Sequence, residues 1–116
     1  KLKERWLSHP QLMSAKGFDH CFFVDEKDNG VVAKLTSADE KLTMEVLTNQ
    51  PGLQVYTGNY LAGAPARDSE LYHDYEGVCL EAQLIPDSPN RPELGDPWLH
   101  PGKTYHHQTR YRFVAK

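Results

Sequence analysis

The chain has 116 residues, of which 39% are hydrophobic, 25% charged and 10% aromatic, and its formal net charge is −3. This length suits one domain or a piece of one, with room for a modest core. The slight negative charge and the lack of Lys/Arg runs argue against nucleic acid, and no stretch reaches the roughly 18 apolar residues of a membrane span. We therefore expect a soluble protein with a small neutral or polar partner.

Two cysteines, Cys21 and Cys79, lie far apart and form no CxxC pair. Reduced packing residues of a cytosolic protein are the favoured interpretation, and a disulfide is the alternative. The start of the chain is charged from Lys1 to Arg5, and the apolar segment of a secretory signal does not follow. A cytoplasmic location is the resulting expectation.

The first elements combine a weak helix signal with the beginning of a β pattern. Residues 3–13 predict a short helix or an irregular lead-in, and Pro10 would interrupt any helix there. Residues 20–24 predict a short strand, and Asp28-Asn29-Gly30 predicts a turn.

A hairpin is predicted next, formed by residues 31–37 and 42–48 around a turn at 38–41. In its second strand Leu42, Met44 and Val46 share one face, and Thr43 and Glu45 share the other. This alternation is typical of a strand in an antiparallel sheet.

The rest of the chain predicts three more strands, at residues 53–57, 78–85 and 104–115, with a turn at 50–52 and a loop at 61–69. A proline-rich connection of residues 86–102 precedes the last strand, and unstructured connections this long are often functional. Many short strands without a long helix predict an all-β sandwich or open barrel. No linker divides the sequence, so residues 1–116 are expected to belong to a single domain.

Glu81 is the most informative polar residue, because it lies in the middle of the strand predicted at 78–85. Val78, Leu80, Ala82 and Leu84 alternate to one side, and Glu81 lies on the other. A carboxylate partly desolvated in such a position can exchange protons near neutral pH. The pattern alone favours the other interpretation, an exposed Glu on the solvent face of an antiparallel sheet.

Two further polar residues raise the same question. Gln54 alternates with Leu53 and Val55, and its amide could hydrogen-bond a sugar hydroxyl or lie on the surface. Asp19 stands at a strand entrance, where it could accept hydroxyl hydrogen bonds or cap a turn.

The six histidines do not form a convincing metal site. His106 and His107 are adjacent and so point to opposite faces of a strand, and the other four show no ligand spacing. The sequence also lacks a glycine-rich phosphate loop and a GxSxG elbow. We expect neither a metal nor a cofactor.

Four motifs, in order along the chain, resemble those of the aldose 1-epimerase (galactose mutarotase) family. They are Gly17-Phe18-Asp19-His20, the segment 48–61 (TNQPGLQVYTGNYL), the segment 77–83 (GVCLEAQ) with 86–90 (PDSPN), and the segment 99–105 (LHPGKTY). The resemblance is closest to the galactose mutarotase branch, and hexose-6-phosphate epimerases are more distant. Lys103 and Ala82-Gln83 depart from the usual pattern but lie outside the chemical roles.

The resemblance implies the C-terminal portion of an antiparallel β-sandwich and an isomerase that interconverts the α and β anomers of galactose and glucose. It implies that Glu81 is the catalytic base, and that Asp19 and Gln54 hydrogen-bond sugar hydroxyls. His20 belongs to the motif without an assigned catalytic role.

The resemblance covers only about the last third of a family member. The general-acid histidine, a second histidine and an Asn-Arg pair come from the N-terminal half, and His73, His106 and His107 match none of them. We expect little or no activity from the chain alone, and a partner that is either the missing N-terminal part or another copy of the chain. A non-catalytic carbohydrate-binding or interaction module on the same fold is the alternative.

Overall fold

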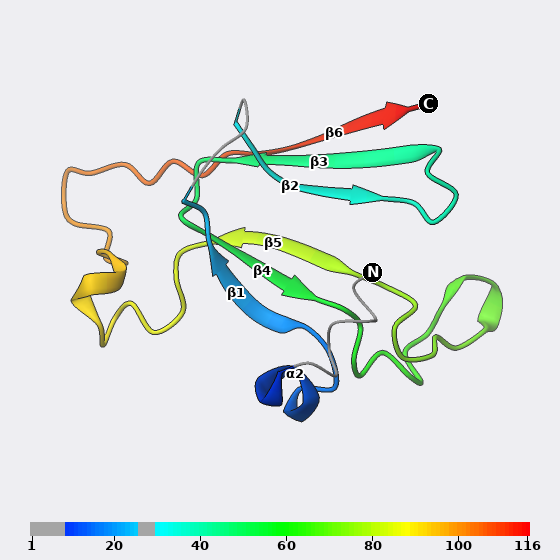
Figure 1. The fold of residues 1–116 in the computed structure, drawn as a ribbon. Helices are drawn as coiled ribbons and strands as arrows, with labels where there is room; N and C mark the ends of the chain where they lie inside the picture. The colour runs from blue at the N-terminus through cyan, green and yellow to red at the C-terminus, as the bar shows by residue number, and fades with distance from the viewer. Residues whose placement is uncertain (1–8, 26–29) are drawn as a thin grey trace. The chain divides into compact units, whose positions relative to one another are not determined.

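The computed structural model describes residues 9–25 and 30–116, which form an all-β chain with few short helices (Figure 1). Its strands make two three-stranded antiparallel sheets, with the orders β1-β4-β5 and β2-β3-β6. This confirms the predicted fold class. In chain order the elements are α2 (Pro10–Ser14), β1 (Asp19–Phe23), β2 (Val31–Thr36), β3 (Leu42–Thr48), β4 (Gly52–Tyr56), the 3-10 helix η2 (Arg67–Ser69), β5 (Cys79–Gln83), the 3-10 helix η3 (Pro92–Leu94) and β6 (Thr109–Ala115).

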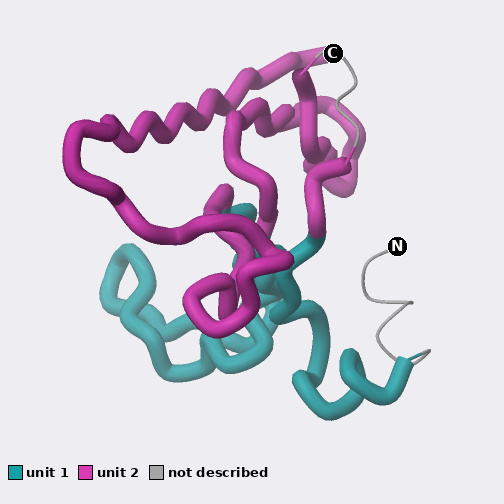
Figure 2. Tube along the Cα trace, turned by 90° about the vertical axis from the view of Figure 1, so that its left-hand side faces the viewer, with its two compact units in different colours: residues 1–22, 54–81 teal, residues 23–53, 82–116 magenta. Residues whose placement is uncertain are grey.

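The chain divides into two compact units, each built from two segments that are distant in sequence (Figure 2). Unit 1 consists of residues 1–22 and 54–81 and contains α2 with most of β1, β4 and β5. Unit 2 consists of residues 23–53 and 82–116 and contains β2, β3 and β6. Among the described helices, none is long and apolar enough to cross a membrane.

The hairpin of β2 and β3 is confirmed, and β6 adds to the other edge of β3. Val46 lies at the centre of β3, between Ala33 of β2 and Tyr111 of β6, and its side chain is fully buried. The described residues whose apolar side chains are buried all belong to unit 2: Val31, Val46, Leu53 and Ile85. Burial of apolar side chains therefore contributes more to the stability of unit 2 than to that of unit 1.

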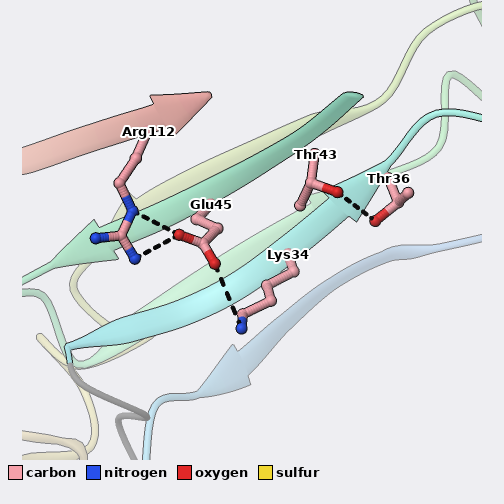
Figure 3. Close-up of polar contacts among 5 residues, drawn as sticks. All are labelled: Lys34, Thr36, Thr43, Glu45 and Arg112. Carbon is pink, nitrogen blue, oxygen red and sulfur yellow. Dashed lines mark hydrogen bonds and ion pairs between the residues drawn. The ribbon is translucent and has the colours of Figure 1, made fainter. Parts of the chain in front are cut away.

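The opposite face of this sheet carries polar contacts across all three strands (Figure 3). The carboxylate of Glu45 accepts from Arg112 Nε at 2.6 Å and pairs with Arg112 Nη2 at 2.5 Å, while Lys34 Nζ lies 3.3 Å from its other oxygen. Farther along the hairpin, the hydroxyls of Thr36 and Thr43 are 3.1 Å apart. The hydrogen bond from Arg112 holds the pKa of Glu45 below its usual value, against the opposing effect of desolvation.

Within the described residues, Pro10 is the first residue of α2. The first helical position has no intrahelical N–H bond to lose, so the proline ring is tolerated there. His9 caps the helix, and its Nδ1 accepts a hydrogen bond from the Gln11 N–H at 3.3 Å. Residues 3–8 of the predicted lead-in, and Asp28 and Asn29 of the predicted turn, lie outside the described residues.

The last strand is shorter than predicted, since β6 begins at Thr109 and not at residue 104. Thr109 pairs with Thr48, where β3 ends, so the residues before it have no strand partner in β3. The carbonyl of Gln108 accepts hydrogen bonds from the Asn49 N–H at 3.3 Å and the Thr48 hydroxyl at 3.0 Å. Likewise, β5 covers residues 79–83 of the strand predicted at 78–85.

Candidate functional site

The three polar residues singled out by the sequence lie on three neighbouring strands of one sheet (Figure 1). Asp19 is the first residue of β1, Gln54 is the middle residue of β4, and Glu81 is the middle residue of β5. All three belong to unit 1, and the strand that carries Gln54 separates the other two. Residues 62 positions apart in the sequence are thus brought to one sheet.

Asp19 and Gln54 are in direct contact. The amide Nε2 of Gln54 donates a hydrogen bond to Asp19 Oδ1 at 2.8 Å, so the two side chains project from the same face of the sheet. Among the described residues, Asp19 Oδ2 and Gln54 Oε1 make no hydrogen bond with another side chain. Those two oxygens can accept hydrogen bonds from hydroxyl groups of a ligand.

The position of Glu81 relative to Gln54 follows from a close approach of two backbones. A Cβ at Gly58 would lie 2.8 Å from the carbonyl oxygen of Gly77. Gly58 is two residues beyond the end of β4, and Gly77 is two residues before the start of β5. From this contact we expect an uninterrupted antiparallel register between the neighbouring strands β4 and β5, which would place Gln54 level with Glu81 on the same face.

Glu81 is exposed in this structure, and so is Cys79, two residues earlier on the same strand. This exposure matches the solvent-facing interpretation that the alternation alone favoured. Cys21 is half-buried and Cys79 is exposed, so only Cys21 has the character of a packing residue.

None of the described histidines makes a hydrogen bond or ion pair with the side chain of Asp19, Gln54 or Glu81. The ring of His20 accepts a hydrogen bond from the backbone N–H of Asp19 at 3.0 Å. The ring of His73 pairs with Glu76 in the loop before β5. The backbone N–H of His73 also donates a hydrogen bond to the Glu76 carboxylate, and this bond is the main reason why the pKa of Glu76 is lowered. His106 and His107 lie in unit 2. Residues 9–25 and 30–116 also contain no group of three acidic, His or Cys side chains arranged to hold a metal ion.

A buried polar network beside Asp19 was not predicted from the sequence. The side chain of Asn59, at 0% exposure, donates from Nδ2 to the carbonyls of Ala15 and Phe18, and its Oδ1 accepts from the hydroxyl of Thr57. Asn59 lies within the segment 48–61 that resembles the family, but Gly58-Asn59 after the strand is a pair more typical of a turn. We call Ala15, Phe18, Thr57 and Asn59 the Asn59 network.

A separate cavity of about 440 Å³ lies in unit 2, within the long connection before β6. Its lining includes Trp98, which is 66% exposed, together with Asp96, Lys103 and Tyr105. Hydrogen bonds from the Trp98 N–H and from His100 lower the pKa of Asp96. An exposed indole beside a carboxylate is a combination that can stack on and hydrogen-bond a polar ring.

Comparison with known proteins gives one consistent result. The family profile described as Aldose 1-epimerase matches residues 2–112. The aldose 1-epimerase of Escherichia coli (strain K12) is 42% identical over 119 residues, which cover 99% of this chain and 34% of that protein. The galactose mutarotases of Mus musculus and Homo sapiens are 39% and 37% identical, over 91% and 90% of this chain and 32% and 31% of their own lengths, respectively. The chain thus spans about a third of the length of the curated relatives it matches.

Proposed function

The chain belongs to the aldose 1-epimerase family, and from that membership we propose that it supplies the base and two sugar-binding residues of a mutarotase site. The observation that carries this proposal is the meeting of Asp19, Gln54 and Glu81 on adjacent strands, with Asp19 and Gln54 hydrogen-bonded at 2.8 Å. The proposed substrates are aldohexoses such as galactose and glucose. The cytoplasm is the proposed compartment.

Mutarotation requires only proton transfers at a hemiacetal. A base removes the proton of the anomeric hydroxyl while an acid protonates the ring oxygen, and the C1–O5 bond opens to give a free aldehyde. Rotation about C1–C2 presents the other face of the carbonyl, and reclosure with the reverse proton transfers gives the other anomer. Glu81 is proposed as the base, because a carboxylate can accept and return a proton in both directions.

Asp19 and Gln54 are proposed to hold sugar hydroxyls beside that carboxylate. Their remaining acceptor oxygens, Asp19 Oδ2 and Gln54 Oε1, lie on either side of a hydrogen bond that fixes the spacing of the two side chains. Fixing the sugar against the base lowers the entropy cost of reaching the reactive geometry. The family resemblance assigns the acid to a histidine outside this chain.

A partner is therefore part of the proposal. It is the N-terminal part found in the longer relatives, or another copy of the chain. Apolar side chains on β6, at the edge of its sheet, support a missing partner: Tyr111 is 49% exposed and Phe113 is 63% exposed. Exposed edge strands and apolar patches of this kind are ordinarily covered in a folded protein.

Polarimetry of α-galactose and α-glucose tests the proposal. The chain alone is expected to leave the mutarotation rate near that of buffer. Supplied with the N-terminal two-thirds of the Escherichia coli relative, as one polypeptide, it is expected to accelerate the reaction, and Glu81→Gln is expected to remove about 10²–10⁴-fold of that acceleration. Glu70→Gln, which neutralises an exposed carboxylate in the same unit, is the matched control and is expected to change the rate little.

Two outcomes would contradict the assignment. If Glu81→Gln and Glu70→Gln retain the same rate, Glu81 is not the base. If the chain alone catalyses mutarotation and loses the activity on Glu81→Gln, the acid does not come from outside this chain.

The cavity beside Trp98 favours a second candidate, a non-catalytic carbohydrate-binding module. The two candidates differ in which residue galactose binding by the isolated chain depends on. Binding that is lost in Trp98→Ala and unchanged in Asp19→Asn supports the binding module. The reverse result supports the mutarotase site.

A further inference from the structure

Unit 1 contains the proposed sugar-binding residues but lacks a buried apolar side chain among its described residues. Asn59 is the one described residue of unit 1 that combines zero exposure with a polar side chain. The geometry around Asp19 must then depend on hydrogen bonds more than on core packing.

The side chain of Asn59 ties the segment before β1 to the end of β4. Its Nδ2 donates to Ala15 O at 2.8 Å and to Phe18 O at 3.0 Å, and its Oδ1 accepts from Thr57 Oγ1 at 2.6 Å. Both amide protons are therefore used, and no buried side-chain polar atom of a described residue is left without a partner. Burying an amide is costly unless it is fully hydrogen-bonded, as it is here.

Phe18, the residue immediately before Asp19, is held at both ends of its backbone. Its N–H donates to Thr57 Oγ1 at 3.0 Å, and its carbonyl accepts from the Thr57 N–H at 3.1 Å as well as from Asn59. The carbonyl uses both of its lone pairs in these contacts. The starting point of β1, and with it the position of Asp19, is fixed against β4.

The packing around this amide leaves little freedom. A Cβ at Gly17 would lie 2.5 Å from Asn59 Oδ1 and 2.7 Å from Thr57 Oγ1, so the backbone at this point passes directly against the network. One residue earlier, the Lys16 carbonyl accepts from the Tyr75 hydroxyl at 2.9 Å. Desolvation, aided by the charge of Asp74, raises the pKa of Tyr75.

We propose that Asn59 is a positioning residue for sugar binding: through Phe18 it holds Asp19 at hydrogen-bonding distance from Gln54. Asn59 itself is buried and does not touch the ligand. The proposal rests on the proposed role of Asp19 and Gln54 in binding hydroxyls. Its physical basis is that a fully satisfied polar network specifies one local geometry, whereas a partly satisfied one does not.

The test uses two variants of the chain and one matched control. Asn59→Asp keeps the shape of the side chain but removes both donors and sets a carboxylate against two carbonyls. Asn59→Ser removes the same contacts without adding a charge, and it decides the question if the Asp variant does not fold. Asn49→Asp is the control, because Asn49 makes a comparable clasp in unit 2, donating to His106 O at 2.9 Å and accepting from the Gln108 N–H at 3.0 Å.

Two readouts separate positioning from general stability. The first, by NMR without sugar, is the chemical shift and hydrogen exchange of the Gln54 side-chain amide, which report its bond to Asp19. The second is the Kd for galactose from an NMR titration. The Asn59 variants are expected to lose the Gln54 signature and to weaken binding about tenfold or more, equivalent to about 1.4 kcal/mol. Asn49→Asp is expected to lower the urea midpoint while leaving both readouts unchanged.

An unchanged Gln54 signature in a folded Asn59 variant would overturn the proposal. So would an equal effect of Asn49→Asp on both readouts, since that would show a loss of general stability. If the unmodified chain does not bind galactose, the proposed function is in question, but the sugar-free Gln54 signature still decides the role of Asn59.

Discussion

The register expected between β4 and β5 can be tested at Gly58, where the chain after β4 passes close to the chain before β5. Gly58 has φ +68°, in the left-handed region, and a Cβ there would lie 2.8 Å from the carbonyl oxygen of Gly77. Gly58→Ala therefore has two costs, a left-handed alanine and a clash with backbone that cannot rotate away. This clash should separate β4 from β5, the neighbouring strands that carry Gln54 and Glu81.

Gly63 provides a control for the first of these costs. It has φ +84°, and a Cβ there would meet nothing within 4 Å. Gly63→Ala is expected to cost about 1 kcal/mol from the left-handed conformation alone. Gly58→Ala adds the cost of overpacking, about 1–3 kcal/mol, for a total of about 2–4 kcal/mol.

Urea unfolding followed by circular dichroism measures the difference. With an m-value of about 2 kcal/mol/M, Gly58→Ala should unfold about 0.5–1.5 M earlier than Gly63→Ala. Galactose binding should weaken in Gly58→Ala and stay unchanged in Gly63→Ala, since only the former displaces Glu81 from Gln54. Equal midpoints and equal binding in the two variants would refute both the close contact and the register counted from it.

Two further predictions concern the sheet of unit 2 and use the same unfolding assay. Val46→Ala should lower the free energy of unfolding by about 1.5–3 kcal/mol, because it removes two buried methyl groups and leaves a cavity. Val114→Ala, on the exposed edge strand β6, should cost less than about 1 kcal/mol. Similar losses in the two variants would contradict the burial of Val46 in the middle strand. Glu45→Gln should destabilise the chain near neutral pH, since the bond from Arg112 lowers the pKa of folded Glu45 below 4.5 and therefore stabilises the fold above the unfolded pKa. That advantage should vanish as the pH falls through the folded pKa, and a difference that persists unchanged at acid pH would contradict the ion pair.

Local sequence signals predicted most of the strands, since they depend on nearest neighbours along the chain. The alternation of Leu42, Met44 and Val46 predicted the strand, and the structure pairs these residues with β6 in that order, although Leu42 is 45% exposed and only Val46 of the three is buried. Errors occurred where a distant partner decides the outcome. The final strand begins at Thr109, and not at residue 104, because β3 ends at Thr48, which no pattern within residues 104–115 can indicate.

The candidate site divides in the same way. Asp19, Gln54 and Glu81 were found by motif resemblance, which depends on residue identity and order. Asn59 lies in one of the same motifs, but its burial and contacts were missed, because its hydrogen bonds go to Ala15 and Phe18, 44 and 41 residues earlier in the chain. A single amide gives no sign in the sequence of which carbonyls it will meet.

By itself the sequence determined the family and the all-β class, and it predicted three site residues, because motifs and two-residue periodicity are properties of the linear chain. Only the tertiary structure decided that these residues share one sheet, that Asp19 and Gln54 are hydrogen-bonded, and that a buried amide holds the entrance of β1. The physical reason is that strand pairing and polar burial join groups far apart in sequence, and their geometry exists only once the backbone has brought them together.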